Sequence, residues 1–223
     1  MRRARRTGKT ALFRDRAEAG ERLAEALQAF RNQEAVVLGI PRGGVEVGAA
    51  VARSLGATLD VVIPRKVGAP GNPELGIGAV AEGVHVLDDH LVKALGVGED
   101  YIRAEVQVQE AEIRRRTAIY RGDRPGPQLA GKAAVVVDDG VATGGTAVAA
   151  LRWARGQSAA TVLLAVPVAP KEAVTRLERE ADEVHVLATP EPFYAVGQWY
   201  DEFPQVTDQE VIELLASAAK GKG

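Results

Sequence analysis

The sequence predicts an α/β fold: a Rossmann-like parallel sheet with helices on both faces. Two observations support this prediction. Short runs that are almost entirely apolar alternate with longer segments of helical periodicity along most of the chain. Strands without a polar side are typical of parallel sheets, because helices cover both faces of such a sheet. The length of 223 residues and the hydrophobic content of 46% allow a sizeable core, so we expect one domain over residues 1–223.

The first half of the chain predicts a βαβ unit that follows an amphipathic helix. We expect that helix over residues 14–30, where alanine and leucine share one face and charged residues lie opposite. A strand over 35–40, a helix over 45–55 and a strand over 59–63 then form the βαβ unit. Residues 67–79 are rich in glycine and proline, which predicts a mobile loop.

The second half continues the alternation after a long charged helix over residues 99–121. A hairpin of residues 77–80 and 84–87 precedes that helix. A capping box of Thr207 and Glu210 begins the last helix. The other expected elements are strands over 132–138, 161–168 and 183–187, and helices over 146–155, 171–180 and 207–218.

Composition and the first residues limit the functional classes. The net charge of −2 gives no general attraction to nucleic acid or acidic lipids, and no apolar run has the length of a membrane span. The chain lacks cysteine and begins without the apolar segment of a secretory signal, so we expect a cytoplasmic protein. Four arginines among residues 1–10 predict a solvated tail, with a weak phosphate or RNA contact as the alternative.

The most informative motif runs over residues 135–146, where three valines lead into two carboxylates and a loop of small and hydroxyl residues. This order predicts a strand, a loop with free backbone N–H groups and a helix N-terminus, which together suit a phosphate. Gly144 and Gly145 let the backbone approach an anion, and Thr143 and Thr146 add hydroxyl donors.

Asp138 and Asp139 are expected at the carboxyl end of the strand, where open α/β sheets bind ligands. Acceptors for hydroxyls beside donors for a phosphate suggest a sugar phosphate. The plainer alternative is that Asp-Asp-Gly is only a turn that caps a helix.

Two further segments carry candidate anion-binding groups. A second strand–loop–helix unit contains the loop Pro41, Arg42, Gly43 and Gly44, although an ordinary turn would explain it equally well. Arg65 and Lys66 follow the next predicted strand, where they are either anion ligands or a solvated rim.

The motif over residues 135–146 resembles the loop that binds phosphoribosyl pyrophosphate (PRPP) in type I phosphoribosyltransferases, and it is most similar to that of adenine phosphoribosyltransferase. The resemblance covers about residues 35–190 and implies that family's fold, with a small hood at about 190–205 and the terminal segments. It implies transfer of the 5-phosphoribosyl group from PRPP to a nitrogenous base with release of diphosphate. It also implies Mg²⁺ as cofactor. We further expect a homo-oligomer, a dimer, and from the charge and the apolar runs we expect no nucleic-acid or membrane partner.

The resemblance assigns roles to individual residues. The PRPP loop would comprise Asp138, Asp139, Gly140, Val141, Ala142, Thr143, Gly144, Gly145 and Thr146. Its two acids would hold the ribose hydroxyls and meet Mg²⁺ indirectly, through PRPP and water. The pyrophosphate loop would comprise Pro41, Arg42, Gly43 and Gly44. The catalytic candidates are Arg65, Lys66 and Glu74, the last in a loop that closes over the reacting centre or simply in solvent.

Aromatic residues concentrate near the C-terminal end of this region. The family's hood sets base specificity, so the resemblance predicts a ring stacked on the base. The candidates are Phe193, Tyr194, Trp199 and Tyr200. A satellite core under a loop is the alternative explanation for this cluster.

Three functions fit this pattern: a transferase, a regulatory protein that senses PRPP with little or no turnover, and a hydrolase of PRPP-like compounds. Ala142 stands where the hypoxanthine–guanine enzymes carry an acid that contacts the base, which disfavours 6-oxopurines handled in that way. Residues 65–74 resemble a poorly characterised branch of predicted phosphoribosyltransferases.

Overall fold

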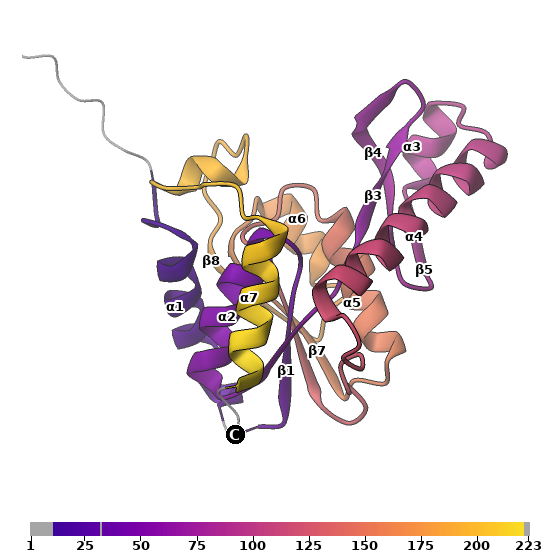
Figure 1. Cartoon of the computed structure of the whole chain (residues 1–223). Coiled ribbons are helices and arrows are strands. Elements are labelled where there is room, and N and C mark those ends of the chain that lie inside the picture. Colours follow the sequence, from indigo (N-terminus) through magenta and orange to yellow (C-terminus); the bar gives the residue numbers. More distant parts are fainter. Residues whose placement is uncertain (1–10, 32, 221–223) are drawn as a thin grey trace, which may run out of the picture.

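The computed structural model describes residues 11–31 and 33–220, so the arginine-rich segment of residues 1–10 lies outside the described residues. A five-stranded parallel sheet in the order β2-β1-β6-β7-β8 forms the centre (Figure 1). Its strands are β1 (Ala35–Gly39), β2 (Thr58–Val61), β6 (Ala133–Val137), β7 (Thr161–Val168) and β8 (Glu183–Ala188). Every neighbouring pair is parallel, and β1 pairs with β6 at the centre, which confirms the predicted α/β fold.

Helices cover both faces of the main sheet (Figure 1). Helices α1 (Arg16–Ala26), α2 (Gly43–Leu55) and α7 (Asp208–Lys220) pack into one hydrophobic cluster, and α5 (Gly145–Gly156) and α6 (Lys171–Leu177) into another. Along β6, Val135 and Val137 belong to the first cluster and Val136 to the second. The strand has no polar side because both of its faces are covered.

A second, antiparallel sheet and two helices stand beside the main sheet, as a separate lobe in Figure 1. The sheet contains β3 (Arg65–Ala69), β4 (Asn72–Ala81) and β5 (Val84–Leu87), and the helices are α3 (Asp89–Ala94) and α4 (Glu99–Arg121). Ala79, Ala81 and Val86 of this sheet share a hydrophobic cluster with α5. The antiparallel pairing of β4 with β5 confirms the predicted hairpin.

The prediction of a mobile loop over residues 67–79 is wrong, because most of this segment forms the β3–β4 hairpin. Gly71 forms the turn with φ +72°, which favours glycine. A Cβ atom on Gly68 would lie 2.7 Å from the Cα atom of Pro73, so only glycine fits where the strands approach. The same glycines that predicted a loop therefore allow a tight, bulged hairpin.

Arg65 and Lys66 are also placed differently from the prediction. The strand of the main sheet, β2, ends at Val61, and Arg65 begins β3 in the second sheet. These two cations therefore lie at the base of the hairpin and not at the carboxyl end of a parallel strand.

The remaining helices differ from prediction mainly at their ends. The first helix stops at Ala26 and continues as a 3-10 turn, η1 (Gln28–Phe30), and the short α3 was not predicted. The capping box of α7 is confirmed: the Glu210 N–H donates to the Thr207 hydroxyl at 3.2 Å, and the Thr207 N–H donates to the Glu210 carboxylate at 2.7 Å.

The segment over 190–206, which contains the 3-10 turn η2 (Val196–Trp199), runs beside the start of α1. The N–H groups of Leu12 and Phe13 donate to the Trp199 carbonyl at 2.9 and 3.1 Å. We call residues 190–206 the hood segment. In the described part of the chain, no helix combines the length and the apolarity that crossing a membrane requires.

Candidate functional site

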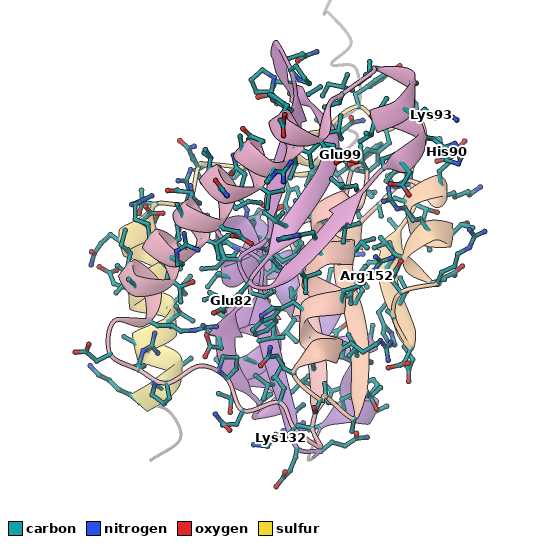
Figure 2. The ribbon with its side chains drawn as sticks, turned by 90° about the vertical axis from the view of Figure 1, so that its right-hand side faces the viewer. Glu82, His90, Lys93, Glu99, Lys132 and Arg152 are labelled. Carbon is teal, nitrogen blue, oxygen red and sulfur yellow. The ribbon has the colours of Figure 1, made fainter. Side chains whose placement is uncertain are left out.

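A cavity of about 620 Å³ lies between the loop after β6 and the β3–β4 hairpin. The loop contributes Asp138 and residues 140–146 to its wall, and the hairpin contributes Lys66 and residues 74–76. In Figure 2, His90 and Lys93 of α3 mark the end of the molecule where the hairpin stands, and Lys132, just before β6, lies at the opposite end. The cavity is therefore at the carboxyl edge of the main sheet, where α/β proteins bind ligands.

The wall formed by the loop presents backbone donors. Gly144 has φ +84° and serves as the N-cap of α5, and no side chain caps this helix end. Because the first N–H groups of a helix lack partners within the helix, they remain available to an anion. Thr143 and Thr146 add hydroxyl groups on the same wall. This arrangement is suited to a phosphate group.

Asp138 lies on the cavity wall beside these donors. Burial disfavours its charged form and the neighbouring Asp139 adds negative charge, so the pKa of the Asp138 carboxyl is raised well above its usual range. The Asp139 N–H donates to Asp138 Oδ1 at 2.9 Å. A carboxyl held in this way can accept hydrogen bonds from the hydroxyls of a sugar.

Asp139 has a different environment from its neighbour. Its Oδ2 atom accepts a hydrogen bond of 2.7 Å from Nε of Arg16, which lies in the first turn of α1 and is only 5% exposed. Burial raises the pKa of Asp139, and the Arg16 charge opposes this rise. Asp139 does not belong to the wall of the cavity.

Arg16 was not singled out in the sequence, although a signal existed. Position 16 falls on the apolar face of its helix, together with the buried Ala19, Leu23 and Ala24. An arginine at such a position requires a buried partner.

The loop of residues 41–44 packs against the acid pair. A Cβ atom on Gly43 would clash with the Asp139 carboxylate, and one on Gly44 would lie 2.6 Å from the Val137 carbonyl oxygen. The peptide bond between Pro41 and Arg42 is cis. None of these four residues belongs to the wall of the 620 Å³ cavity. The predicted pyrophosphate loop therefore adjoins the acids without lining the cavity.

Arg42 points toward the start of α7, where its Nη1 atom lies 3.8 Å from Oδ1 of Asp208. The hydroxyl of Tyr120, from α4, donates to the same Oδ1 atom at 2.6 Å. Burial and this hydrogen bond raise the pKa of Tyr120 to about 12. Arg42 is thus placed at the junction of α4 and α7.

The three catalytic candidates are only partly brought together. Lys66 and Glu74 both line the cavity, and the Lys66 ammonium donates to the Glu74 carboxylate at 3.1 Å and to its carbonyl at 2.9 Å. Arg65 lies outside the cavity wall, and its Nε donates to Gln109 Oε1 at 3.0 Å. Burial, and next the charge of Arg116, lower the pKa of Arg65.

A comparison with known families decides what this site belongs to. The family model described as "Phosphoribosyl transferase domain" matches residues 14–197. The chain belongs to this family. The prediction from the sequence motif is therefore confirmed at the level of the family.

Two relatives share nearly half of their aligned residues with this phosphoribosyl transferase domain. A Mycobacterium tuberculosis protein named "Putative phosphoribosyl transferase Rv0571c" is 47% identical over 208 residues, which cover 93% of this chain and 47% of the relative. The chain therefore spans about half the length of the curated relatives it matches. TT1426 from Thermus thermophilus, whose crystal structure is known, is 47% identical to this chain. The two structures superpose with a TM-score of 0.78, and the match covers 92% of this chain and 98% of TT1426.

The aromatic candidates of this phosphoribosyl transferase domain do not lie on the cavity wall. Trp199 and Tyr200 are each 5% exposed and pack with Phe13 in a satellite core, with Phe193 at its border. Tyr194 is 83% exposed and lies outside that core. The satellite-core explanation describes this arrangement, and the hood segment contributes Val196 to the cavity instead.

Arg176 is a further cavity residue that sequence reasoning missed. It lies in the last turn of α6 and lines the cavity together with the loop that ends at Thr146. The adjacent Leu177 side chain would contact a Cβ atom on Gly144 at 3.6 Å, so α6 packs directly on this loop. No local pattern could place Arg176 here, because the packing of α6 on the loop brings it to the site.

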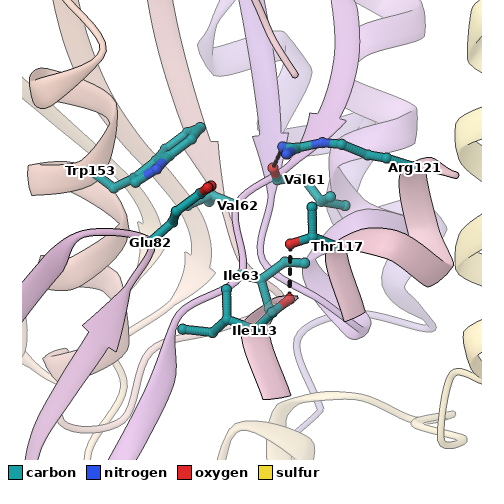
Figure 3. A pocket seen from close by; sticks show the side chains of 8 residues that line it. All are labelled: Val61, Val62, Ile63, Glu82, Ile113, Thr117, Arg121 and Trp153. Carbon is teal, nitrogen blue, oxygen red and sulfur yellow. Dashed lines mark hydrogen bonds between the residues drawn. The ribbon is translucent and has the colours of Figure 1, made fainter. Parts of the chain in front are cut away.

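Another hollow, shown in Figure 3, has a volume of only about 10 Å³. It is lined by Val61, Val62, Ile63, Glu82, Ile113, Thr117, Arg121 and Trp153. Within this hollow, the Arg121 guanidinium donates a hydrogen bond to the Val61 carbonyl at 2.7 Å. This hollow has room for about one water molecule, so it is not a substrate site.

Proposed function

We propose that this domain transfers the 5-phosphoribosyl group from PRPP to a nitrogenous base and releases diphosphate. One observation carries the proposal: a single cavity combines an uncapped helix N-terminus, a partly buried carboxyl and a cation from a separate hairpin. A sugar with a phosphate at one end and a diphosphate at the other requires this combination of donors, acceptors and positive charge.

The 5-phosphate would bind to the loop of Thr143, Gly144, Gly145 and Thr146, with Arg176 beside it. This phosphate does not react, so its binding energy serves to orient the ribose. Gly140, Val141 and Ala142 complete the same wall, and position 142 offers no carboxylate to a 6-oxopurine.

In the reaction, the bond between the anomeric carbon and the diphosphate oxygen breaks and a bond from that carbon to the nitrogen of the base forms. The base loses the proton of its N–H group, which passes to water or to the departing diphosphate. The ribose ring becomes positively charged as the first bond loosens. Asp138 would accept hydrogen bonds from the ribose hydroxyls and place negative charge near that cation, which stabilises the transition state more than the ground state.

Lys66 would contact the departing diphosphate from the hairpin side, and Glu74 would hold this ammonium in the cavity until the ligand arrives. Arg65 and Arg42 lie farther out, and their roles as diphosphate ligands stay predictions. The loop of Pro41, Gly43 and Gly44 would support the acid pair by packing against it, and its role as a diphosphate ligand stays a prediction.

The donor set fits Mg²⁺ that arrives with the substrate. In the part of the chain that the structure describes, no three His, Asp or Glu side chains are placed to hold a metal, and Asp138 offers a single carboxyl to the cavity. Substrate oxygens and water would supply the other ligands, and an indirect role of Asp139 through PRPP and water stays a prediction. When bound, Mg²⁺ would neutralise charge on the diphosphate. The cytoplasmic location, the homodimer and the lack of a nucleic-acid partner stay predictions.

Calorimetry with PRPP and Mg²⁺, followed by an assay of diphosphate release with a panel of nucleobases, tests this proposal. We expect saturable binding of PRPP and diphosphate release that depends on one base. Binding without turnover for any base would replace the transferase with a PRPP sensor, and diphosphate release without a base would replace it with a hydrolase. Absence of PRPP binding would contradict all three functions.

A further inference from the structure

The two adjacent acids of the PRPP loop have unequal surroundings. We infer that the two acids have different roles. Asp138 is the acid that faces the ligand, whereas Asp139 forms a buried ion pair with Arg16 that holds the hood segment against the loop; we call this ion pair the lock. The part of this inference that concerns Asp138 rests on the proposed function. The part that concerns the lock does not, because it describes contacts within the chain.

Arg16 connects three separate parts of the chain. Its Nε donates to Asp139 at 2.7 Å, and its Nη1 donates to the carbonyl of Pro204 in the hood segment, also at 2.7 Å. The guanidinium lies 3.7 Å from the centre of the Phe203 ring, and its Nη1 is 3.8 Å from the Glu46 carboxylate. One buried guanidinium therefore holds α1, the acid loop and the hood segment in a fixed arrangement.

A second contact joins the same two parts. The hydroxyl of Tyr200 donates to the backbone carbonyl of Asp139 at 2.6 Å, so the hood segment grips this residue through its backbone as well. Gly43 fits against the Asp139 carboxylate on the remaining side. The Asp139 carboxylate therefore contacts protein groups on several sides, with 16% of its side chain exposed, whereas Asp138 lines the cavity.

These contacts predict that removing either member of the lock has the same consequence. Breaking a buried ion pair by removing one partner leaves the other charge desolvated and unpaired, which is much more harmful than removing both. The hood segment should then separate from the loop. Arg16 is a positioning residue in this account, because it acts through Asp139.

Hydrogen exchange and thermal melting of the ligand-free chain test the lock. We expect Arg16→Met and Asp139→Asn each to lower Tm and to speed amide exchange over residues 199–206. The double variant Arg16→Met/Asp139→Asn should lose less Tm than the sum of the two single variants, and Arg16→Lys should retain more protection than Arg16→Met. Asp100→Asn is the matched control, because its partner Arg103 lies in an exposed ion pair. Additive losses of Tm in the double variant, with unchanged exchange in the hood segment, would overturn the lock.

Titration with PRPP and Mg²⁺ tests the division of work between the acids. Loss of a charge-assisted hydrogen bond weakens binding by about 10- to 100-fold, so we expect Asp138→Asn to lose at least about ten times more PRPP affinity than Asp139→Asn. Asp138→Asn should leave exchange over residues 199–206 at the parental level. Equal losses of affinity for the two variants would contradict the division. If the parent itself does not bind PRPP, the proposed function fails, and the exchange experiment still decides the lock.

Discussion

Gly44 lies so close to Asp138 that a Cβ atom on the glycine would come within 2.8 Å of the Asp138 Cα atom. The predicted pyrophosphate loop and the acid pair are therefore packed backbone against backbone. Residue 44 lies in the first turn of α2 and residue 138 follows β6, so this contact joins the two strand–helix units at the carboxyl ends of β1 and β6.

Replacing Gly44 with alanine should displace the acid loop. Backbone atoms form the contact, so they cannot yield as a flexible side chain would, and overpacking of this kind typically costs about 1–3 kcal/mol. We expect a lower free energy of unfolding and weaker PRPP binding. Gly156→Ala is the control, because this glycine ends α5 and a Cβ atom there meets nothing within 4 Å. Denaturant unfolding measures both variants, and equal stabilities would show that the contact is not restrictive.

Lys66 and Glu74 should respond in opposite directions. Lys66→Met removes a cation from the cavity and should weaken binding of inorganic diphosphate by about tenfold. Glu74→Gln removes a competing carboxylate, so diphosphate should bind as tightly as in the parent or more tightly. The ion pair is largely exposed, with the Glu74 side chain 94% accessible, so Glu74→Gln should change stability by less than about 1 kcal/mol. Calorimetry with diphosphate checks both, and a marked loss of affinity in Glu74→Gln would refute the assignment.

The two ends of the proposed ligand should be separable. Arg176 lines the cavity with the loop that ends at Thr146. We therefore expect Arg176→Gln to weaken the binding of ribose 5-phosphate and to leave the binding of diphosphate unchanged. Lys66→Met should show the reverse pattern. Arg179→Gln, just beyond the end of the same helix, is a charge-matched control outside the cavity wall. A variant that weakens both ligands equally would mean that the cavity does not orient them as proposed.

Tyr120 should make stability sensitive to alkaline pH. Its folded pKa of about 12 lies above the ordinary value, because burial and the hydrogen bond to Asp208 favour the neutral phenol. This contribution is fully present below the unfolded pKa of about 10 and is lost as the pH rises through the folded value. Tyr120→Phe should therefore cost about 1.5–3 kcal/mol near pH 8, with a smaller difference from the parent near pH 11.5.

Urea unfolding at these two pH values measures the effect. Tyr194→Phe serves as the control, since that side chain is 83% exposed and should leave stability unchanged at both. A difference between Tyr120→Phe and the parent that is the same at pH 8 and pH 11.5 would contradict the account.

The sequence was informative where the structure depends on neighbours along the chain. The strand, loop and helix over residues 133–156 follow from apolar β-branched residues, two glycines and a helical pattern, all of which act locally. The capping box at Thr207 is local in the same way. Such features can be predicted because the residues that determine them are adjacent.

Contacts between distant segments could not be predicted. Arg16 and Asp139 are separated by 123 positions, and only the packing of α1 against the acid loop brings them together. The composition of residues 67–79 is the same for a loop and for a tight hairpin, because both need glycine and proline at turns. Arg176 reaches the cavity only because α6 packs on the loop of residues 140–146 that follows β6.

The central claim is that one cavity at the carboxyl edge of the main sheet holds PRPP. A crystal structure of the chain grown with PRPP and Mg²⁺ tests it most directly. We predict the 5-phosphate on the backbone N–H groups of residues 143–146, the ribose hydroxyls on Asp138, and the diphosphate facing Lys66. PRPP bound at another surface, with the loop at 143–146 empty, would contradict the account.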